Sequence, residues 1–263
     1  MAIIRTNKIA LALCISAALL LCAHPASAQA HADHQPHWSY SGADGPAHWG
    51  DLSPDFAACK TGRRQSSLNI VAAQKADLAP IDFEYQLSPL KIINNGHAIQ
   101  VNYAPGSSIS INGIALPLVQ FHFHHLSETE INGKKYDMEL HLVHIDAASG
   151  RAAVVAILIK SGNENPLIGQ LWNYIPTEVG KQVEHKKMVF NAADFLPADK
   201  NYYVFDGSLT TPPCSEGIKW YVLKTPIEAS PAQIARFARL YPDNARPVQP
   251  QNGRKVEESQ FTK

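Results

Sequence analysis

Residues Phe121–His125 read FHFHH and residues Glu139–His144 read ELHLVH, so five histidines fall in two short apolar runs. In an extended strand, successive side chains point to opposite faces of the sheet. His122 and His124 then share one face of the first run, and His141 lies on the corresponding face of the second. The residues that mark the opposite face as core are Phe121, Phe123, Leu140 and Leu142. The alternation therefore predicts two half-buried β-strands with three histidines on their polar face.

Strand patterns also surround these two runs. Alternating apolar segments fold back at Asn95-Gly96, Asn112-Gly113 and Asn132-Gly133, and Asn-Gly between such segments is a strong hairpin signal. We expect the third turn to connect the two histidine strands and to place them side by side. Residues 152–160 read AAVVAILIK, a continuous apolar run that is typical of a buried strand.

Few helices are expected. Asn165-Pro166 opens one short helix, PLIGQLWNY, and Ser230-Pro231, with Gln233 completing a capping box, opens another, PAQIARFARLY. No repeat or low-complexity linker follows Gln29. The sequence therefore predicts a single domain of mainly β class (α+β by some schemes), with a mostly antiparallel sheet and short peripheral helices.

Three imidazoles without a fourth protein ligand suit a catalytic Zn²⁺, one per chain, because such a site keeps one position open for water. Gln120 and Glu139 each lie two residues before a histidine of the same face, where they can accept a hydrogen bond from its ring N–H. His125 and His144 fall on the other face and are interpreted as ordinary core or surface histidines. A polar strip without a metal remains the alternative.

The first residues have the design of a secretory signal peptide. A basic start with Arg5 and Lys8 precedes the apolar run Ile9–Leu21, and Ala26-Ser27-Ala28 is an A-x-A cleavage site. We therefore expect a signal peptide over residues 1–28, a catalytic domain over 29–263, and a periplasmic or secreted location. A membrane anchor is less favoured because the apolar run is shorter than the ~20 residues that span a bilayer. No other segment is apolar enough to span a membrane.

Two cysteines, Cys59 and Cys214, remain after the signal peptide is removed. An even pair in an oxidising compartment favours a disulfide, and two free buried thiols are the alternative. Loss of Arg5 and Lys8 leaves 21 basic against 23 acidic residues. Without a basic patch or a charge block, nucleic acid is not expected as a partner.

The predicted mature chain begins Gln29-Ala30-His31. A free amine, two amides and a histidine in third position can form a square-planar nitrogen site for Cu²⁺ or Ni²⁺. A solvated tail that binds no metal is the alternative, and cyclisation of Gln29 would abolish the site.

Six segments, in order, resemble the α-class carbonic anhydrases over nearly all of the mature chain. These segments are HWSY with GPAHWG, RRQSSLNI, INNGHAIQV, QFHFH with ELHLVH, YYVFDGSLTTPPCSEGIKW and NARPVQP. The resemblance implies a large twisted, mostly antiparallel central sheet with zinc at the bottom of a conical cleft. It implies reversible hydration of CO₂ to bicarbonate and a proton (EC 4.2.1.1), through zinc-bound hydroxide and a histidine proton shuttle.

The resemblance also assigns roles to residues at matching positions. His122, His124 and His141 would bind the zinc, in agreement with the alternation of faces. Thr210 would accept a hydrogen bond from the hydroxide and donate one to Glu128. His97 would be the proton shuttle. The residues that order water next to it would be Tyr40, Asn95 and Gln100.

The substrate side follows from the same resemblance. The apolar wall where CO₂ waits would be formed by Val143, Val154, Leu209 and Trp220. The backbone amide of Thr210 and the side chain of Thr211 would contact bicarbonate or inhibitors, which are expected to be sulfonamides and anions. A disulfide from Cys59 to Cys214 would brace the loop that positions Thr210. A homodimer is left open.

The residues present disfavour two other functions. A catalytically silent domain of this family, acting in binding, typically loses one or more zinc histidines, whereas this chain keeps all three together with Glu128 and Thr210. A zinc hydrolase acting mainly on esters lacks support, because the sequence has no H-E-x-x-H motif and no serine nucleophile motif.

Overall fold

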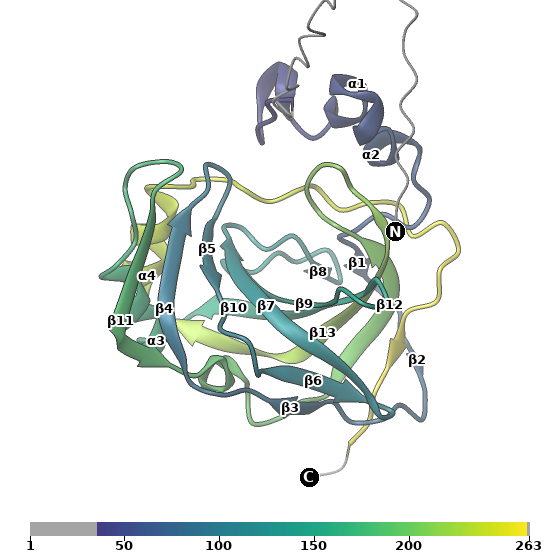
Figure 1. Ribbon diagram of the computed structural model, residues 1–263. Coiled ribbons are helices and arrows are strands. Elements are labelled where there is room, and N and C mark those ends of the chain that lie inside the picture. Colours follow the sequence, from purple (N-terminus) through teal and green to yellow (C-terminus); the bar gives the residue numbers. More distant parts are fainter. Residues whose placement is uncertain (1–35, 262–263) are drawn as a thin grey trace, which may run out of the picture. The chain divides into compact units, whose positions relative to one another are not determined.

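The two histidine-bearing runs lie on β7 (Ile114–His124) and β9 (Met138–Asp146), which pair antiparallel in the middle of the sheet (Figure 1). Their register sets His122 opposite His141 and His124 opposite Glu139. The three histidines therefore occupy adjacent positions on one face of two neighbouring strands, as the alternation predicted.

The computed structural model describes residues 36–261, and these form one compact unit. The predicted signal peptide and the Gln29-Ala30-His31 segment lie outside the described residues. The remaining strands are β1 (Asn69–Ile70), β2 (Gln74–Lys75), β3 (Asp82–Glu84), β4 (Ser88–Asn94), β5 (Ile99–Asn102), β6 (Ser108–Ile111), β8 (Glu130–Ile131), β10 (Arg151–Ser161), β11 (Gln182–Phe190), β12 (Tyr202–Ser208), β13 (Glu216–Ala229) and β14 (Glu257–Glu258). The helices are α1 (Trp49–Leu52), α2 (Ala58–Thr61), α3 (Pro166–Trp172) and α4 (Pro231–Ala238), with 3₁₀ turns at Gly42–Asp44, Pro54–Phe56 and Ala192–Phe195.

Twelve of the strands form one mixed sheet in the order β11-β4-β5-β7-β9-β10-β13-β12-β14-β2, with β3 and β6 attached beside β7. Most neighbours are antiparallel, and the parallel pairs in this sheet are β10 with β13 and β14 with β2. The fold is thus mainly β with short helices, which confirms the predicted class.

Two of the three predicted hairpin turns connect the strands as expected. Asn95-Gly96 joins β4 to β5, and Asn112-Gly113 joins β6 to β7 with both residues at positive φ (52° and 75°). The third prediction is wrong in its connection. Asn132-Gly133 closes only a local bridge between Ile131 and Lys134, within a longer excursion between β7 and β9. That excursion contains β8, which pairs with β1 in a separate two-stranded sheet.

Both predicted helices begin where their caps indicated. The Asn165 side chain accepts hydrogen bonds from the Leu167 and Ile168 amides at the start of α3. Ser230 and Gln233 form the expected capping box at the start of α4. The two helices end at Trp172 and Ala238, before the ends of the segments that the sequence suggested. No helix within residues 36–261 is long and apolar enough to cross a membrane.

Apolar side chains gather in two clusters on the two faces of the central strands. The larger cluster contains the residues predicted as core, namely Phe121, Phe123, Leu140 and Leu142, and it receives the buried faces of α3 and α4. The smaller cluster contains Val143, Val154 and Trp220 and lies on the face that carries His141. The histidines therefore sit at the edge of a small apolar cluster and not within the main core.

Candidate metal centre and active site

Three histidine rings converge at one point on the β7–β9 pair. One ring nitrogen from each of His122, His124 and His141 lies within 4.8 Å of the others. His124 and His141 are buried, whereas His122 keeps partial exposure. His122 is therefore the most exposed of the three rings.

The second nitrogen of each ring is occupied by a protein acceptor. His122 Nδ1 lies 2.9 Å from Gln120 Oε1, and His141 Nε2 lies 3.0 Å from Glu139 Oε1. His124 Nδ1 lies 2.7 Å from the carbonyl oxygen of Asn244. Because these acceptors each take a ring N–H, the opposite nitrogens, Nε2 of His122, Nε2 of His124 and Nδ1 of His141, keep their lone pairs.

These free nitrogens fit a zinc ion. The buried Nε2 of His124 has no hydrogen-bond partner among the described residues, and a buried polar atom without a partner is costly. Burial lowers the pKa of all three histidines, and the neighbouring rings lower that of His122 further. Neutral imidazole is the form that binds metal. A set of three imidazoles suits Zn²⁺ with an open fourth position.

Glu139 is itself held in place by Thr129. The buried carboxylate accepts the backbone N–H of Thr129 at 2.7 Å and its hydroxyl at 2.8 Å. Burial raises the pKa of Glu139, while the hydrogen bonds from Thr129 lower it. The orientation of the His141 ring is therefore fixed through two successive contacts.

A second buried carboxylate, Glu128, lies next to the histidines. Its Oε1 accepts the backbone N–H of Arg246 at 2.8 Å and lies 3.5 Å from His124 Nδ1, and its Oε2 lies 3.9 Å from His141 Nδ1. Burial raises the pKa of Glu128 to about 8, and hydrogen bonding by Arg246 and by the Thr210 side chain opposes that rise. Thr210 is buried beside the same carboxylate.

The four residues expected to form an apolar wall lie together. Val143, Val154 and Trp220 are cross-strand neighbours on β9, β10 and β13, and Leu209 packs against their cluster. The Trp220 ring meets the His141 ring edge-on at 4.9 Å between centroids. The wall therefore borders one of the metal-facing histidines.

His97 lies just after the Asn95-Gly96 turn and is half-buried. Its ring stacks on Trp38 with 3.6 Å between centroids and 8° between planes. Burial, followed by the charge of His37, lowers the pKa of His97 from 6.5. Asn95 accepts the backbone N–H of His97 at 2.9 Å and donates to Gln100 at 3.4 Å. The Tyr40 hydroxyl is buried without a hydrogen-bond partner in the described part of the chain, and burial with the charge of Glu128 raises its pKa.

Two histidines of the opening motif lie apart from this centre. His144 is buried in the main core, with Nε2 at 2.8 Å from the Tyr85 hydroxyl. His125 follows the end of β7, and its Nδ1 contacts the Pro242 carbonyl oxygen at 2.7 Å. Neither belongs to the group of converging nitrogens.

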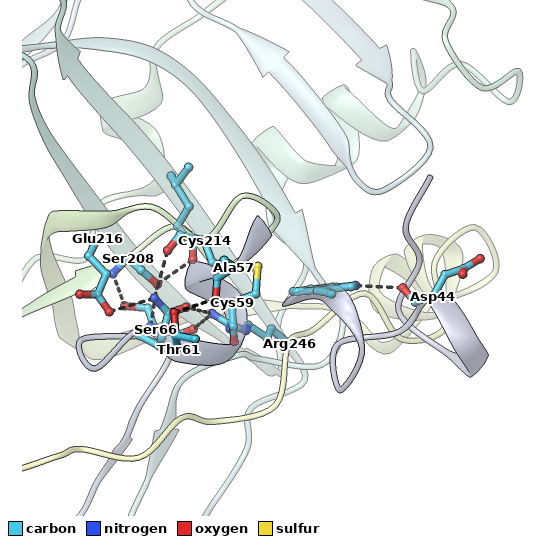
Figure 2. Close-up of a disulfide and its surroundings, with 12 residues drawn as sticks. Asp44, Ala57, Cys59, Thr61, Ser66, Ser208, Cys214, Glu216 and Arg246 are labelled. Atoms are coloured by element: carbon cyan, nitrogen blue, oxygen red, sulfur yellow. Dashed lines mark hydrogen bonds between the residues drawn. A yellow bond between two sulfur atoms is a disulfide. The ribbon is translucent and has the colours of Figure 1, made fainter. Parts of the chain in front are cut away.

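A disulfide joins Cys59, on α2, to Cys214, in the loop after Thr210 (Figure 2). This confirms the pairing over the alternative of two free thiols. Two backbone hydrogen bonds close that loop, Cys214 N–H to Thr211 O at 2.8 Å and Leu209 N–H to Ser215 O at 3.0 Å. The bridge thus fixes the segment that carries Thr210 and Thr211.

Comparison with known proteins gives the same reading. A family model described as eukaryotic-type carbonic anhydrase matches residues 44–260. The chain belongs to the α-class carbonic anhydrase family. It is 47% identical to a carbonic anhydrase of Nostoc sp., over 84% of this chain and 86% of that one, and 43% identical to one of Neisseria gonorrhoeae, over 92% and 95%. The carbonic anhydrase of Thermovibrio ammonificans in complex with sulfanilamide superposes with a TM-score of 0.82 at 42% identity, covering 86% of this chain and all of that one.

As a carbonic anhydrase, the chain catalyses the reversible hydration of CO₂ (EC 4.2.1.1), with His122, His124 and His141 as its zinc site. The sequence analysis assigned no role to two further residues near this site. Asn244 supplies its carbonyl to His124 and donates from its side chain to the carbonyls of His97 and Phe123. Arg246 supplies its amide to Glu128. Their contacts to His124 and Glu128 use backbone groups, so the side-chain types carried no clue to these contacts beyond the match of NARPVQP to the family.

Proposed function

We propose that this carbonic anhydrase orients the attacking oxygen with Thr210 and Glu128, holds CO₂ against the Val143 wall, and exports protons through His97. The observation that carries the proposal is the convergence of three ring nitrogens whose partner nitrogens are all held by acceptors. Zinc in a three-histidine site, for which carbonic anhydrase is the standard example, supplies water with a pKa lowered to about 7 and so provides hydroxide at neutral pH.

Thr210 and Glu128 act as a filter for protonated ligands. In this proposal the Thr210 hydroxyl donates its hydrogen bond to Glu128, so the Thr210 oxygen accepts a hydrogen bond from the zinc ligand on its other side. A zinc ligand that carries a proton can donate it to the Thr210 oxygen in a hydrogen bond and is thereby oriented. A ligand without a proton faces the lone pairs of that oxygen and is disfavoured. The support is the buried position of both groups and the effect of the Thr210 side chain on the pKa of Glu128.

The apolar wall suits CO₂, which has no net dipole and makes no strong hydrogen bond. Val143, Val154 and Trp220 are 7%, 3% and 1% exposed, so these side chains are packed together and largely removed from water. Its contact with the His141 ring would hold CO₂ next to the metal side of the site. Proximity of this kind lowers the barrier because the reactants no longer have to be brought together from solution.

His97 is suited to the proton relay because an imidazole can both accept and donate a proton near neutral pH. The support is its half-buried position, its contact with Trp38, and the neighbouring polar groups of Asn95 and Gln100. A lowered pKa would speed release of the proton to external buffer.

The proposal also covers the inhibitors that the protein binds and its location in the cell. We expect sulfonamides and anions to bind at the zinc with contacts to the Thr210 amide and the Thr211 side chain; a complex of the related protein with the inhibitor sulfanilamide supports the sulfonamide class. The disulfide is consistent with an exported protein, and we infer a periplasmic location after removal of residues 1–28.

Stopped-flow measurement of CO₂ hydration tests the function. The zinc-loaded protein should be active. The rate of CO₂ hydration should fall by more than about 100-fold in His122→Ala, because loss of a metal ligand should cost more than loss of a residue behind a ligand, which costs up to about 100-fold. Equal activity in the two proteins would overturn the proposal. A zinc-bound but inactive native protein would favour the alternative of a silent binding domain.

The relay is tested separately. His97→Ala should turn over about 10-fold more slowly or worse in dilute buffer, because proton export then lacks its carrier. Added imidazole should restore the rate. Turnover that does not depend on buffer in this variant would exclude His97 as the shuttle.

A further inference from the structure

We propose that Gln65 and Arg246 are positioning residues that set the geometry between Thr210 and Glu128. This inference rests on the role proposed above for the Thr210–Glu128 pair. Neither side chain belongs to the group of candidate metal ligands. Together they form a buried hydrogen-bonded chain that begins at the loop carrying Thr210 and ends at the carboxylate of Glu128.

Arg246 forms the Glu128 end of this chain. Its backbone N–H donates to Glu128 Oε1 at 2.8 Å, and its side chain is almost fully buried, with the residue 1% exposed. The guanidinium Nη1 donates to Gln65 Oε1 and to the Ser66 carbonyl, both at 2.9 Å, and Nη2 donates to the Cys59 carbonyl at 3.2 Å. Figure 2 shows Arg246 beside the disulfide and Ser66. The guanidinium therefore fixes the residue whose amide holds Glu128.

Gln65 forms the link to the other end. Its Nε2 donates to the Cys214 carbonyl at 3.0 Å and to Glu216 Oε1 at 3.0 Å, while its Oε1 accepts from Arg246. Every donor of the side-chain amide is used, and the residue is 3% exposed. The amide can satisfy Cys214 and Arg246 only in one orientation, so it fixes their separation.

The Cys214 end of the chain is rigidly tied to Thr210. Cys214 donates its N–H to the Thr211 carbonyl, and it is bonded through sulfur to Cys59. On the near side of Thr210, Ser208 and Ser66 exchange hydrogen bonds at 2.9 and 3.1 Å. Gln65 and Ser66 thus hold the loop on both sides of Thr210, and Arg246 holds the same segment against Glu128.

Loss of these hydrogen bonds should affect the relative placement of Thr210 and Glu128 more than the folding of the chain. Misplacement of a catalytic group by about 1 Å can cost about 100-fold in rate. Loss of an outer partner typically costs about 10–100-fold in activity. Without the Gln65 amide, the Thr210 loop and Glu128 would still fold, but their separation would no longer be fixed.

Gln65→Met is the central test, because methionine keeps the length of the side chain and removes all three hydrogen bonds. The chain offers a matched control in Gln233→Met. Gln233 is 7% exposed and also makes three hydrogen bonds, to Asn165 N, Asn165 O and Ser230 N. It lies at the start of α4, away from Thr210 and Glu128. Both variants should lose comparable stability in thermal unfolding, with the disulfide intact.

The decisive readout is ligand selectivity. Sulfanilamide carries a proton for Thr210 and thiocyanate does not, so the ratio of their Kd values reports on the filter. In zinc-loaded protein, Gln65→Met should change this ratio by about 10-fold toward thiocyanate and lower kcat/KM for CO₂ hydration by about 10-fold. Gln233→Met should leave both at the native values. Arg246→Lys, which keeps the charge but not the forked geometry, should shift the ratio in the same direction.

A double variant separates this inference from the proposed function. Thr210→Ala should itself change the ratio by about 100-fold, and adding Gln65→Met should then have no further effect on it. If Thr210→Ala leaves the ratio unchanged, the proposed filter is wrong. If Thr210→Ala changes the ratio but Gln65→Met does not differ from Gln233→Met, only the positioning role is overturned.

Discussion

Two buried histidines lie three residues apart on β9 and have opposite environments. His141 faces the small apolar cluster, with one ring nitrogen held by Glu139 and the other directed to a point shared with two more imidazoles. His144 is buried on the opposite face, with Nε2 at 2.8 Å from the Tyr85 hydroxyl, and it lies outside the group of converging nitrogens found among the described residues. Burial lowers the pKa of both rings, so burial alone does not distinguish a ligand from a core histidine.

The difference lies in the convergence of free nitrogens. At the metal centre, three acceptors on three different segments each fix a ring so that its remaining nitrogen points inward. At His144, the single hydrogen bond to Tyr85 satisfies one nitrogen and leaves Nδ1 without a partner in the described residues. A histidine becomes a ligand here through the acceptor behind it and the imidazoles beside it.

The largest predicted effect concerns His144 and the stability of the folded protein at acid pH. Burial lowers the pKa of His144 to about 3, below its unfolded value of 6.5. The unfolded chain therefore binds the extra proton first, and stability is lost as the pH falls from 6.5 toward 3. Between pH 6.5 and about 4.5, the free energy of unfolding of the native protein should fall by about 2 kcal/mol because of this histidine.

His144→Gln removes this titration while keeping a partner for Tyr85. Urea unfolding at the two pH values should show the native protein losing about 2 kcal/mol more than the variant. Both proteins are compared with the same zinc loading, so that protonation of the metal ligands contributes equally. Identical pH dependence in the two proteins would show that His144 is not held neutral by the core.

A smaller effect is expected at Glu139, which accepts the hydrogen bond from the His141 ring. Glu139→Gln should weaken zinc binding by about 10-fold or more, because the acceptor that orients His141 loses its charge. Competition with a chelator at fixed pH measures the change in Kd. The contrast with His144 would break down if zinc affinity were unaffected, since the acceptor behind His141 would then have no part in ligation.

The smallest effect is expected at the partner of His144. Tyr85→Phe removes one buried hydrogen bond and should cost about 1 kcal/mol of stability. Zinc affinity and CO₂ hydration should remain native, because the hydroxyl serves only the core face of β9. A measurable drop in zinc affinity would mean that the two faces of β9 are coupled.

Strand alternation was enough to predict the three ligands. It placed His122, His124 and His141 on one face and His144 on the other, because a β-strand has a fixed period of two and its apolar residues reveal the core side. The role of Gln120 and Glu139 as neighbours of the rings followed from the same period. The Asn165 cap of α3 and the capping box of α4 were equally local and could be predicted in the same way.

Contacts between distant segments could not be predicted in this way. Asn244 and Arg246 reach the site through backbone groups, which every residue type possesses. The pattern around Asn132-Gly133 predicts the β7–β9 connection, but β8, just before this turn, pairs with β1, a strand more than sixty residues earlier in the chain. The local sequence pattern therefore predicts which face of a strand a residue occupies and where turns occur. Contacts between residues far apart in the sequence can be identified only from the folded structure or from a family resemblance.

Zinc content and activity in two matched variants test the central claim most directly. His141→Gln and His144→Gln make the same chemical change at two buried positions on one strand. After dialysis against zinc-free buffer, the native protein and His144→Gln should retain about one zinc per chain and hydrate CO₂, whereas His141→Gln should lose both. Equal zinc retention and equal activity in the two variants would contradict the assignment of the metal centre.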